Sequence, residues 1–154
     1  MSTRFTERGV PMAESLSLQL AAQAREVHQS IVECVATRLA ASGHGAVTPS
    51  LLSFLEALDC GVNYGSEIAR RLKVSRQMVA RTVRELVSAG YLEQGVGDGR
   101  QKPIRFTESG ERLISSARQL LVELDRELAR HLEKTALRDA VRTLESVRRA
   151  VGTG

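Results

Sequence analysis

The sequence predicts a mainly α-helical protein with one small β-hairpin, an α+β fold, and three observations support this prediction. Apolar residues recur at three- and four-residue steps over most of the chain, which is the period of an α-helix. Two short runs near the middle, separated by a glycine-rich segment, instead fit strands. Only 3% of the residues are aromatic, whereas 42% are hydrophobic, so Leu, Val, Ile and Ala must fill the core. A length of 154 residues fits one compact domain.

The polar segment of residues 1–11 is expected to be flexible and loosely attached. A helix is predicted within residues 12–47, because six apolar residues share one of its faces: Leu20, Ala24, Val27, Ile31, Val35 and Leu39. This helix is expected to stop at residues 42–45, where two glycines interrupt the pattern.

Three further helices are expected between residues 48 and 89. Thr48 can cap the first of them, and Pro49 suits its first position. Its buried stripe is expected to be Leu51, Leu52, Leu55 and Leu58, with Phe54 on the flank. The second helix covers residues 66–72. A turn at residues 73–74 leads to the third, which Ser75 can cap and which runs to about Ala89.

Residues 91–96 and 103–107 are predicted to pair as a hairpin with a glycine-rich tip. Thr107 can cap a long helix with an apolar stripe from Leu113 to Leu132, and Thr135 can cap a last helix. The predicted organisation is therefore a central region, residues 48–107, between two regions that carry the terminal helices, residues 12–47 and 108–154.

The net charge of +4 is distributed unevenly. Residues 63–106 contain nine basic and four acidic residues, whereas the rest of the chain contains thirteen basic and fourteen acidic residues. Such a local excess of positive charge is expected where the partner is a polyanion. A basic face that is merely solvated would give the same count, so the pattern of the helices must decide between these interpretations.

A helix, a tight turn, a second helix and a hairpin follow one another in the order of a winged helix-turn-helix. On the second helix, the residues predicted to face the core are Val79, Val83, Leu86 and Val87. The opposite face then presents Gln77, Arg81, Arg84, Glu85 and Ser88, while Arg76 projects from the side of the first turn. The major groove of duplex DNA admits one α-helix, and Arg and Gln can each make two hydrogen bonds to a base. This helix is therefore predicted to read DNA.

Residues 51–110 resemble the winged-helix core of the MarR (multiple antibiotic resistance regulator) family. The resemblance is carried by residues 66–72, by residues 74–86 with Gly90-Tyr91-Leu92, and by Asp98-Gly99-Arg100 with residues 104–107 and Gly110. It implies that Arg81 contacts a base or a phosphate, that Arg100 enters the minor groove and that Asp98 orients the wing. The candidate DNA-binding residues are Ser75, Arg76, Gln77, Arg81, Arg84, Asp98, Arg100 and Lys102.

The leucine stripe of residues 113–132 needs a cover, which is either packing within the chain or a second copy. The resemblance implies that the terminal helices, in residues 12–47 and 108–154, build a two-fold dimer. Two recognition helices would then lie in successive major grooves, roughly 34 Å apart. The predicted function is a sequence-specific transcriptional regulator of double-stranded DNA, a ligand-responsive repressor that acts as a homodimer on a pseudo-palindromic operator. The expected partners are DNA, a second copy and an unidentified small-molecule effector between the dimer helices and the winged region.

Two alternatives remain open at this point. One is a winged-helix module that binds proteins and not DNA, and the other is a regulator that senses redox state through Cys34 or Cys60. An enzyme is not expected, because no nucleophile–base pair or phosphate-binding loop occurs at a meaningful spacing. We also expect no cofactor, metal or membrane partner. The polar N-terminus and the two cysteines favour a cytoplasmic location.

Overall fold

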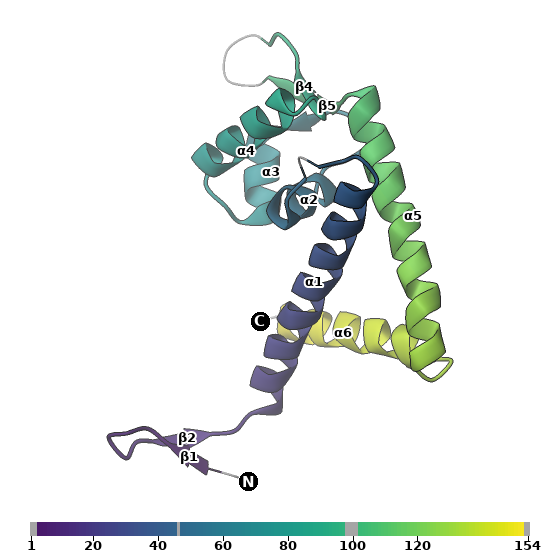
Figure 1. The fold of residues 1–154 in the computed structure, drawn as a ribbon. Helices are drawn as coiled ribbons and strands as arrows, with labels where there is room; N and C mark the ends of the chain where they lie inside the picture. The colour runs from purple at the N-terminus through teal and green to yellow at the C-terminus, as the bar shows by residue number, and fades with distance from the viewer. Residues whose placement is uncertain (1–2, 46, 98–101, 153–154) are drawn as a thin grey trace.

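The computed structural model describes residues 3–45, 47–97 and 102–152 (Figure 1). Its helices are α1 (Leu16–Ala41), α2 (Pro49–Glu56), α3 (Gly65–Leu72), α4 (Arg76–Ser88), α5 (Glu108–His131) and α6 (Ala136–Gly152). Its strands are β1 (Thr3–Phe5), β2 (Pro11–Ala13), β3 (Asn63–Tyr64), β4 (Leu92–Gln94) and β5 (Pro103–Phe106). The predicted α+β fold, mainly helical with a small hairpin in the middle of the chain, is confirmed.

The winged helix-turn-helix occupies one end of the molecule, at the top of Figure 1, where α2, α3 and α4 lie below the β4–β5 hairpin. Strand β5 pairs antiparallel with β4 and also with β3, so the hairpin belongs to a three-stranded sheet of order β3-β5-β4. Strand β3 was not predicted from the sequence. A strand of two residues is too short to show an alternating pattern, and only its pairing with Ile104 and Pro103 reveals it.

The hydrophobic core joins this region to the long helices, since it takes residues from the second half of α1, from α2, α3, α4 and the hairpin, and from the first half of α5. Two predicted burials were wrong. Phe54, placed on the flank of α2, is only 7% exposed, because α2 lies between α1 and α4 and both of its sides are covered. Val87, predicted to face the core, is 39% exposed, because it lies about 80° around α4 from Val79.

Three of the four predicted helix caps are confirmed by their hydrogen bonds. The side-chain oxygens of Thr48, Ser75 and Thr107 accept from the backbone N–H groups three residues further on, at 3.3, 3.1 and 3.0 Å. The predicted turn between α3 and α4 is also present, with Lys73 in the left-handed conformation at φ 55°. Thr107 in addition donates a hydrogen bond of 2.6 Å to the Gly90 carbonyl oxygen, which ties the start of α5 to the end of α4.

The N-terminal segment differs from the prediction. Residues 1–11 were expected to be flexible, but Thr3–Phe5 and Pro11–Ala13 form an antiparallel hairpin. Two strands of three residues are too short for the sequence pattern to reveal them. The hairpin projects from the start of α1, away from the rest of the chain (Figure 1). Residues 4–13 are all exposed, as expected of a loosely attached segment, but the two strands were not expected.

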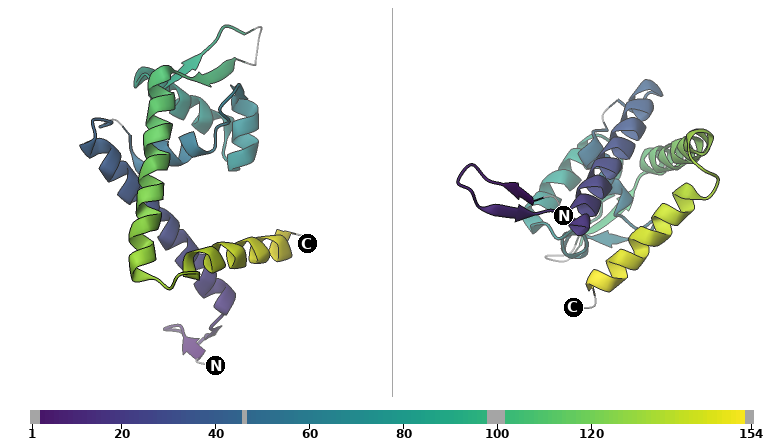
Figure 2. Two further views of the ribbon diagram at one scale, coloured as in Figure 1. Left: turned by 90° about the vertical axis from the view of Figure 1, so that its right-hand side faces the viewer. Right: turned by 90° about the horizontal axis from the view of Figure 1, so that it is seen from below.

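Helices α1, α5 and α6 make up the other end of the molecule, and Figure 2 shows them spread apart, with α6 turning back from the end of α5. An ion pair joins α1 to α5, since Arg38 donates hydrogen bonds of 2.9 and 2.7 Å to the two carboxylate oxygens of Glu127. Within residues 3–45, 47–97 and 102–152, no helix combines the length and apolar character needed to cross a membrane.

The close contact at Gly110 gives a prediction about stability. A Cβ at this position would collide with the Tyr91 carbonyl oxygen and lie 3.0 Å from Phe106 Cδ1. We expect Gly110→Ala to lower the free energy of unfolding by about 3 kcal/mol, because the start of α5 must move away from the end of α4. Gly61→Ala is the control, because a Cβ there meets no atom within 4 Å, and we expect it to change stability by less than about 0.5 kcal/mol. Equal unfolding midpoints of the two variants in urea would show that the close contact at Gly110 does not constrain the packing of α5.

The Arg38–Glu127 ion pair gives a prediction about pH. Its hydrogen bonds lower the pKa of Glu127 below the ordinary value of 4.5, although partial desolvation opposes the shift. A carboxylate with a lowered pKa in the folded state stabilises the fold above pH 4.5, and this contribution is lost as the pH falls through the lowered pKa. We therefore expect Glu127→Gln to be less stable than the wild type at pH 7 and the difference to shrink below pH 4.5.

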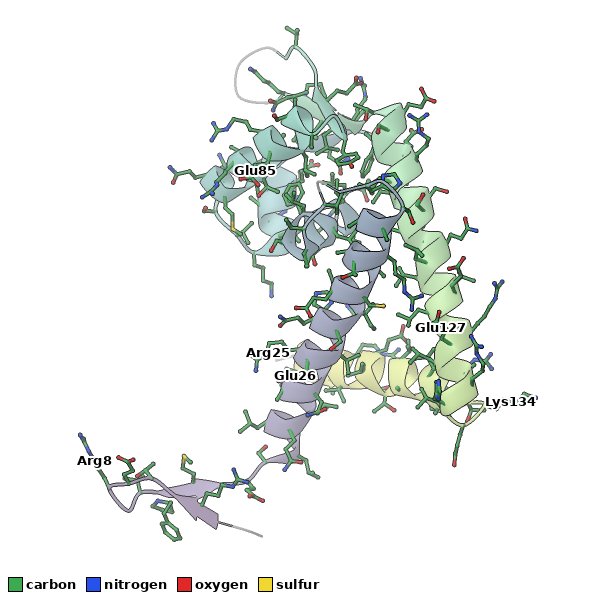
Figure 3. All side chains as sticks on the ribbon, viewed as in Figure 1. Arg8, Arg25, Glu26, Glu85, Glu127 and Lys134 are labelled. Carbon is green, nitrogen blue, oxygen red and sulfur yellow. The ribbon has the colours of Figure 1, made fainter. Side chains whose placement is uncertain are left out.

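The matched control for this measurement is Glu26→Gln on α1, an exposed carboxylate (Figure 3). Urea unfolding at a fixed protein concentration would be followed from pH 7 to pH 3 for both variants. A pH dependence of Glu127→Gln that parallels the wild type throughout would show that this carboxylate does not stabilise the fold.

Candidate nucleic-acid interface

The apolar residues of α4 anchor it to the core and set the direction of its polar face. Val79, Val83 and Leu86 are buried, whereas Gln77, Arg81 and Arg84 are exposed on the opposite side. Arg76 is exposed at the first helical position, directly after the Ser75 cap. The structure thus brings five of the sequence-predicted site residues together on the outer surface of one helix: Ser75, Arg76, Gln77, Arg81 and Arg84.

Arg81 has a partner on its own helix. Its Nε lies 3.2 Å from Oε1 of Glu85, one turn further on. Glu85 is labelled on α4 in Figure 3. The Arg81 side chain nevertheless remains 78% exposed, so the pair does not withdraw the guanidinium from solvent. An exposed pair of this kind contributes little to stability, and a stronger anionic partner can replace Glu85.

The β4–β5 hairpin stands next to α4. Lys102, the residue before β5, is exposed and lines a hollow of about 260 Å³ together with Arg76. The hollow lies between the start of α3, residues 76–83 of α4 and the hairpin, and it is also lined by Tyr64, Ser66 and Gln94. The other two predicted wing residues, Asp98 and Arg100, lie outside the described residues.

Arg70 belongs to the same surface, although the sequence analysis did not select it. It is exposed on α3 and lines a second hollow with Arg76, between α3 and the start of α4. Arg70 was counted within the basic stretch of residues 63–106, but only the outer face of the second helix was considered as a source of site residues. Its place on α3, two residues after the buried Ile68 and next to the buried Ala69, was the signal that could have identified it.

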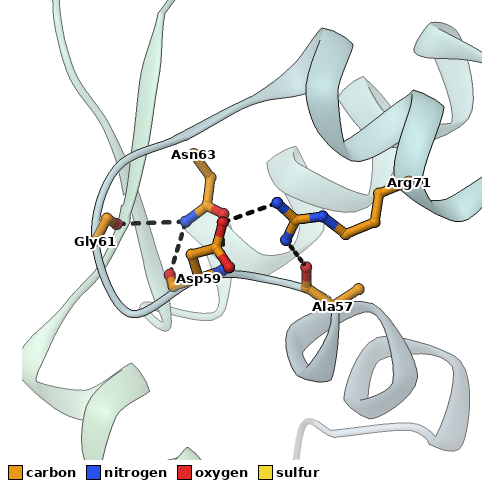
Figure 4. A network of polar contacts seen from close by, with 5 residues as sticks. All are labelled: Ala57, Asp59, Gly61, Asn63 and Arg71. Carbon is orange, nitrogen blue, oxygen red and sulfur yellow. Dashed lines mark hydrogen bonds and ion pairs between the residues drawn. The ribbon is translucent and has the colours of Figure 1, made fainter.

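Arg71, the neighbouring residue, has a different role (Figure 4). It donates hydrogen bonds of 2.6 Å to the Ala57 carbonyl oxygen and 2.8 Å to Oδ2 of Asp59, and the bond to Asp59 raises the pKa of the guanidinium. The buried Asn63 closes the same loop through bonds of 2.8 Å to the backbone N–H and carbonyl of Asp59. Arg71 therefore joins α3 to the loop after α2, and its charge faces a carboxylate.

Five exposed cations on α3, on α4 and directly before β5 make up what we call the basic face. Its described residues are Arg70, Arg76, Arg81, Arg84 and Lys102. The basic face combines a projecting helix, whose side chains can reach into a groove, with cations from α3 and from the residue before β5 that lie beside the first turn of this helix. Guanidinium groups bind phosphates and the edges of bases with two hydrogen bonds, so the arrangement fits a polyanion with grooves. Among residues 3–45, 47–97 and 102–152, no three His, Cys, Asp or Glu side chains are grouped so that they could hold a metal ion.

No protein-family model and no curated protein matches the sequence. Solved structures are similar at low identity. The chain matches MarR from E. coli at 21% identity over 91% of this chain and 98% of that one, with a TM-score of 0.66. A cysteine-to-serine mutant of E. coli MarR, solved in complex with operator DNA, is 22% identical over 88% of this chain and 94% of that one, with a TM-score of 0.68.

A MarR transcriptional regulator from Methanosarcina mazei Go1 is 18% identical over 89% of this chain and 98% of that one, with a TM-score of 0.70. These matches include the terminal helices as well as the winged region, because they cover about nine-tenths of both chains. The chain therefore has the fold of the MarR-family transcriptional regulators.

Proposed function

We propose that this protein is a sequence-specific regulator of transcription that belongs to the MarR family and binds double-stranded DNA. The main support for this proposal is the basic face, above all the outward position of Gln77, Arg81 and Arg84 on α4. An α-helix fits the major groove, where Arg can make two hydrogen bonds to guanine and Gln two to adenine. The similar E. coli structure that contains operator DNA supports this choice of partner.

The cations beside α4 are assigned to the phosphate backbone. Arg70, Arg76 and Lys102 line two adjoining hollows beside the first turn of α4. A helix inserted into the groove brings the two phosphate strands close to these positions, and such contacts fix the orientation of the protein without reading sequence. By the family resemblance, Arg100 of the wing is assigned to the minor groove, and Asp98 is assigned to orienting the wing.

A homodimer on a pseudo-palindromic operator completes the proposal. The apolar residues of α6 are exposed, including Val141, Leu144 and Val147, and the second half of α5 is only partly covered. A two-fold axis through these helices leaves both copies of α4 free to enter successive major grooves. A protein-binding winged module is less favoured, because its outer helix face would more often be apolar or acidic than rich in arginine.

Regulation by a small molecule is part of the proposal, and the family resemblance supports it. The effector would bind between the terminal helices and the winged region, and it would change the spacing of the two α4 helices. The regulator would then act as a repressor that the effector releases from its operator. Measurement of operator affinity across a panel of phenolic and aromatic acids would test this part, and an affinity that no compound changes would count against it.

The proposed reading of DNA is tested by Arg81→Ala. Duplexes that the wild type selects from a random pool serve as the operator. We expect the variant to bind them on the order of ten- to a hundredfold more weakly, because one base or phosphate contact is lost. Gel shift at several salt concentrations would measure the affinity, and light scattering would show whether the dimer persists.

Arg118→Ala on α5 removes the same charge away from the basic face and should leave operator affinity within about twofold. If Arg118→Ala weakened binding as much as Arg81→Ala, the effect would reflect total charge and not a contact at α4. A wild type that selects no duplex from the pool would refute sequence-specific binding altogether.

Glu85→Gln tests the same surface by removing a negative charge, whereas Arg81→Ala removes a positive one. The carboxylate lies on the proposed DNA-binding surface and pairs with Arg81. Its removal should release Arg81 and take away a repulsion against phosphate, so we expect operator affinity to rise a few-fold at low salt and less at high salt. Glu145→Gln on α6 is the control with the same charge change. A loss of affinity in Glu85→Gln would instead mean that this carboxylate accepts a hydrogen bond from a base.

A further inference from the structure

The loop between α2 and β3 is held by hydrogen bonds that centre on Asn63 (Figure 4). Asn63 is 2% exposed, and its side-chain oxygen accepts from the backbone N–H of Asp59 at 2.8 Å. Its amide nitrogen donates to the carbonyl oxygens of Asp59 and Gly61, at 2.8 and 3.3 Å. Loss of a buried partner leaves polar groups unsatisfied, which is costly. The conformation of the loop, residues 57–63, therefore depends on this one side chain.

Arg71 attaches α3 to the same loop. Its Nη1 donates to the carbonyl oxygen of Ala57 and its Nη2 to Oδ2 of Asp59, so one guanidinium binds two points of the loop. A guanidinium presents its N–H groups in a rigid planar fork, whereas the ammonium of lysine is a point charge on a flexible stem. The two bonds therefore fix the direction of α3 relative to the loop. We call Asp59, Asn63, Arg71 and the backbone groups that they bind the loop network.

The loop leads directly into the sheet that contains the β4–β5 hairpin. Asn63 pairs with Ile104 of β5, and Tyr64 pairs with Pro103. Strand β5 lies between β3 and β4, and Ile104 is buried, so a shift of β3 also displaces the hairpin. The loop network therefore connects α3 to the β4–β5 hairpin through the backbone of Asn63.

The junction of β3 and α3 forms one wall of the hollow between α4 and the β4–β5 hairpin. Residues 64–66 of this junction line the hollow, together with Gln94 and Lys102 at the hairpin and Arg76 on α4. In duplex DNA, the width of the major groove sets the distance between its floor and the phosphate strands beside it. A recognition helix and a hairpin can therefore bind one duplex together only when the protein holds them at a matching distance.

We infer that Asp59, Asn63 and Arg71 are positioning residues for the binding of DNA. None of the three lines this hollow, and the guanidinium of Arg71 is bound to the loop, whereas Arg70 lies in the hollow beside α4. The loop network holds α3 and the β4–β5 hairpin at the spacing with which α4 enters the major groove while the hairpin meets the adjacent backbone. This inference rests on the proposed function, because the spacing matters only when one duplex binds both elements.

The first test removes the carboxylate of the loop network. Asp59→Ala takes away a negative charge and frees Arg71, so electrostatics alone would raise the affinity for a polyanion. We expect the opposite, an operator affinity at least about tenfold lower, because α3 and the hairpin lose their common anchor and a base contact is weakened. Glu56→Ala, at the exposed last residue of α2, removes the same charge outside the network and should leave the affinity within about twofold. An Asp59→Ala variant that binds as tightly as the wild type, or more tightly, overturns the inference.

The second test separates positioning by Arg71 from a direct contact with phosphate. A phosphate contact would survive in Arg71→Lys, and its loss in Arg71→Ala would lower the salt dependence of the affinity by about one counterion per chain. We expect Arg71→Lys and Arg71→Ala to bind the operator at least about tenfold more weakly, both with the salt dependence of the wild type. Wild-type affinity in Arg71→Lys, or a reduced salt dependence in Arg71→Ala, overturns the inference.

Footprinting with hydroxyl radicals distinguishes positioning from a smaller folded fraction. At saturating protein, we expect Asp59→Ala to keep the protection of the backbone beside α4 and to lose the protection beside the β4–β5 hairpin. Thr48→Ala removes the N-cap of α2, which lowers stability outside the loop network, and should give the wild-type pattern. A wild-type pattern in Asp59→Ala overturns the inference and leaves the proposed function standing. A wild type that selects no duplex from the pool overturns both.

Discussion

The contact between the buried side of α4 and the core is the constraint on which the rest of the structure depends. Val79, Val83 and Leu86 are spaced by four and three residues, so they form one narrow stripe, and their burial fixes the rotation of the helix about its axis. Once that rotation is set, Gln77 and Arg81 must face outward. The chemistry of the outer face therefore follows from the packing of the inner one.

The sequence was sufficient for those elements whose signals are local. Thr48, Ser75 and Thr107 mark helix starts through the short reach of their own hydroxyl groups, and each forms the predicted hydrogen bond. The helical stripes are long enough to predict, and so is the outward face of α4. Strands of two or three residues carry no comparable pattern, so β3 and the N-terminal hairpin were missed. Their existence depends on pairing between separate segments, such as Asn63 with Ile104.

The candidate site shows the same division between local and tertiary information. Counting charges identified the basic stretch but treated Arg70 and Arg71 alike. These neighbours on α3 point to different surroundings, because successive residues of a helix are about 100° apart. Arg71 meets the carbonyl of Ala57 and the carboxylate of Asp59, while Arg70 faces solvent beside α4. Only the position of α2 and its loop shows that Arg71 supports the fold and that Arg70 remains available for a ligand.

The uncovered surfaces of the chain are separated in a way that supports the proposed function. The basic face lies at one end, whereas the uncovered apolar surface of α1 and α6 lies at the other (Figure 1). Self-association through the apolar end cannot cover α4. The distance between the two α4 helices of a dimer would then depend on the angle between α1 and α5, which the Arg38–Glu127 ion pair helps to hold. An effector that changes this angle would alter DNA binding without touching the basic face.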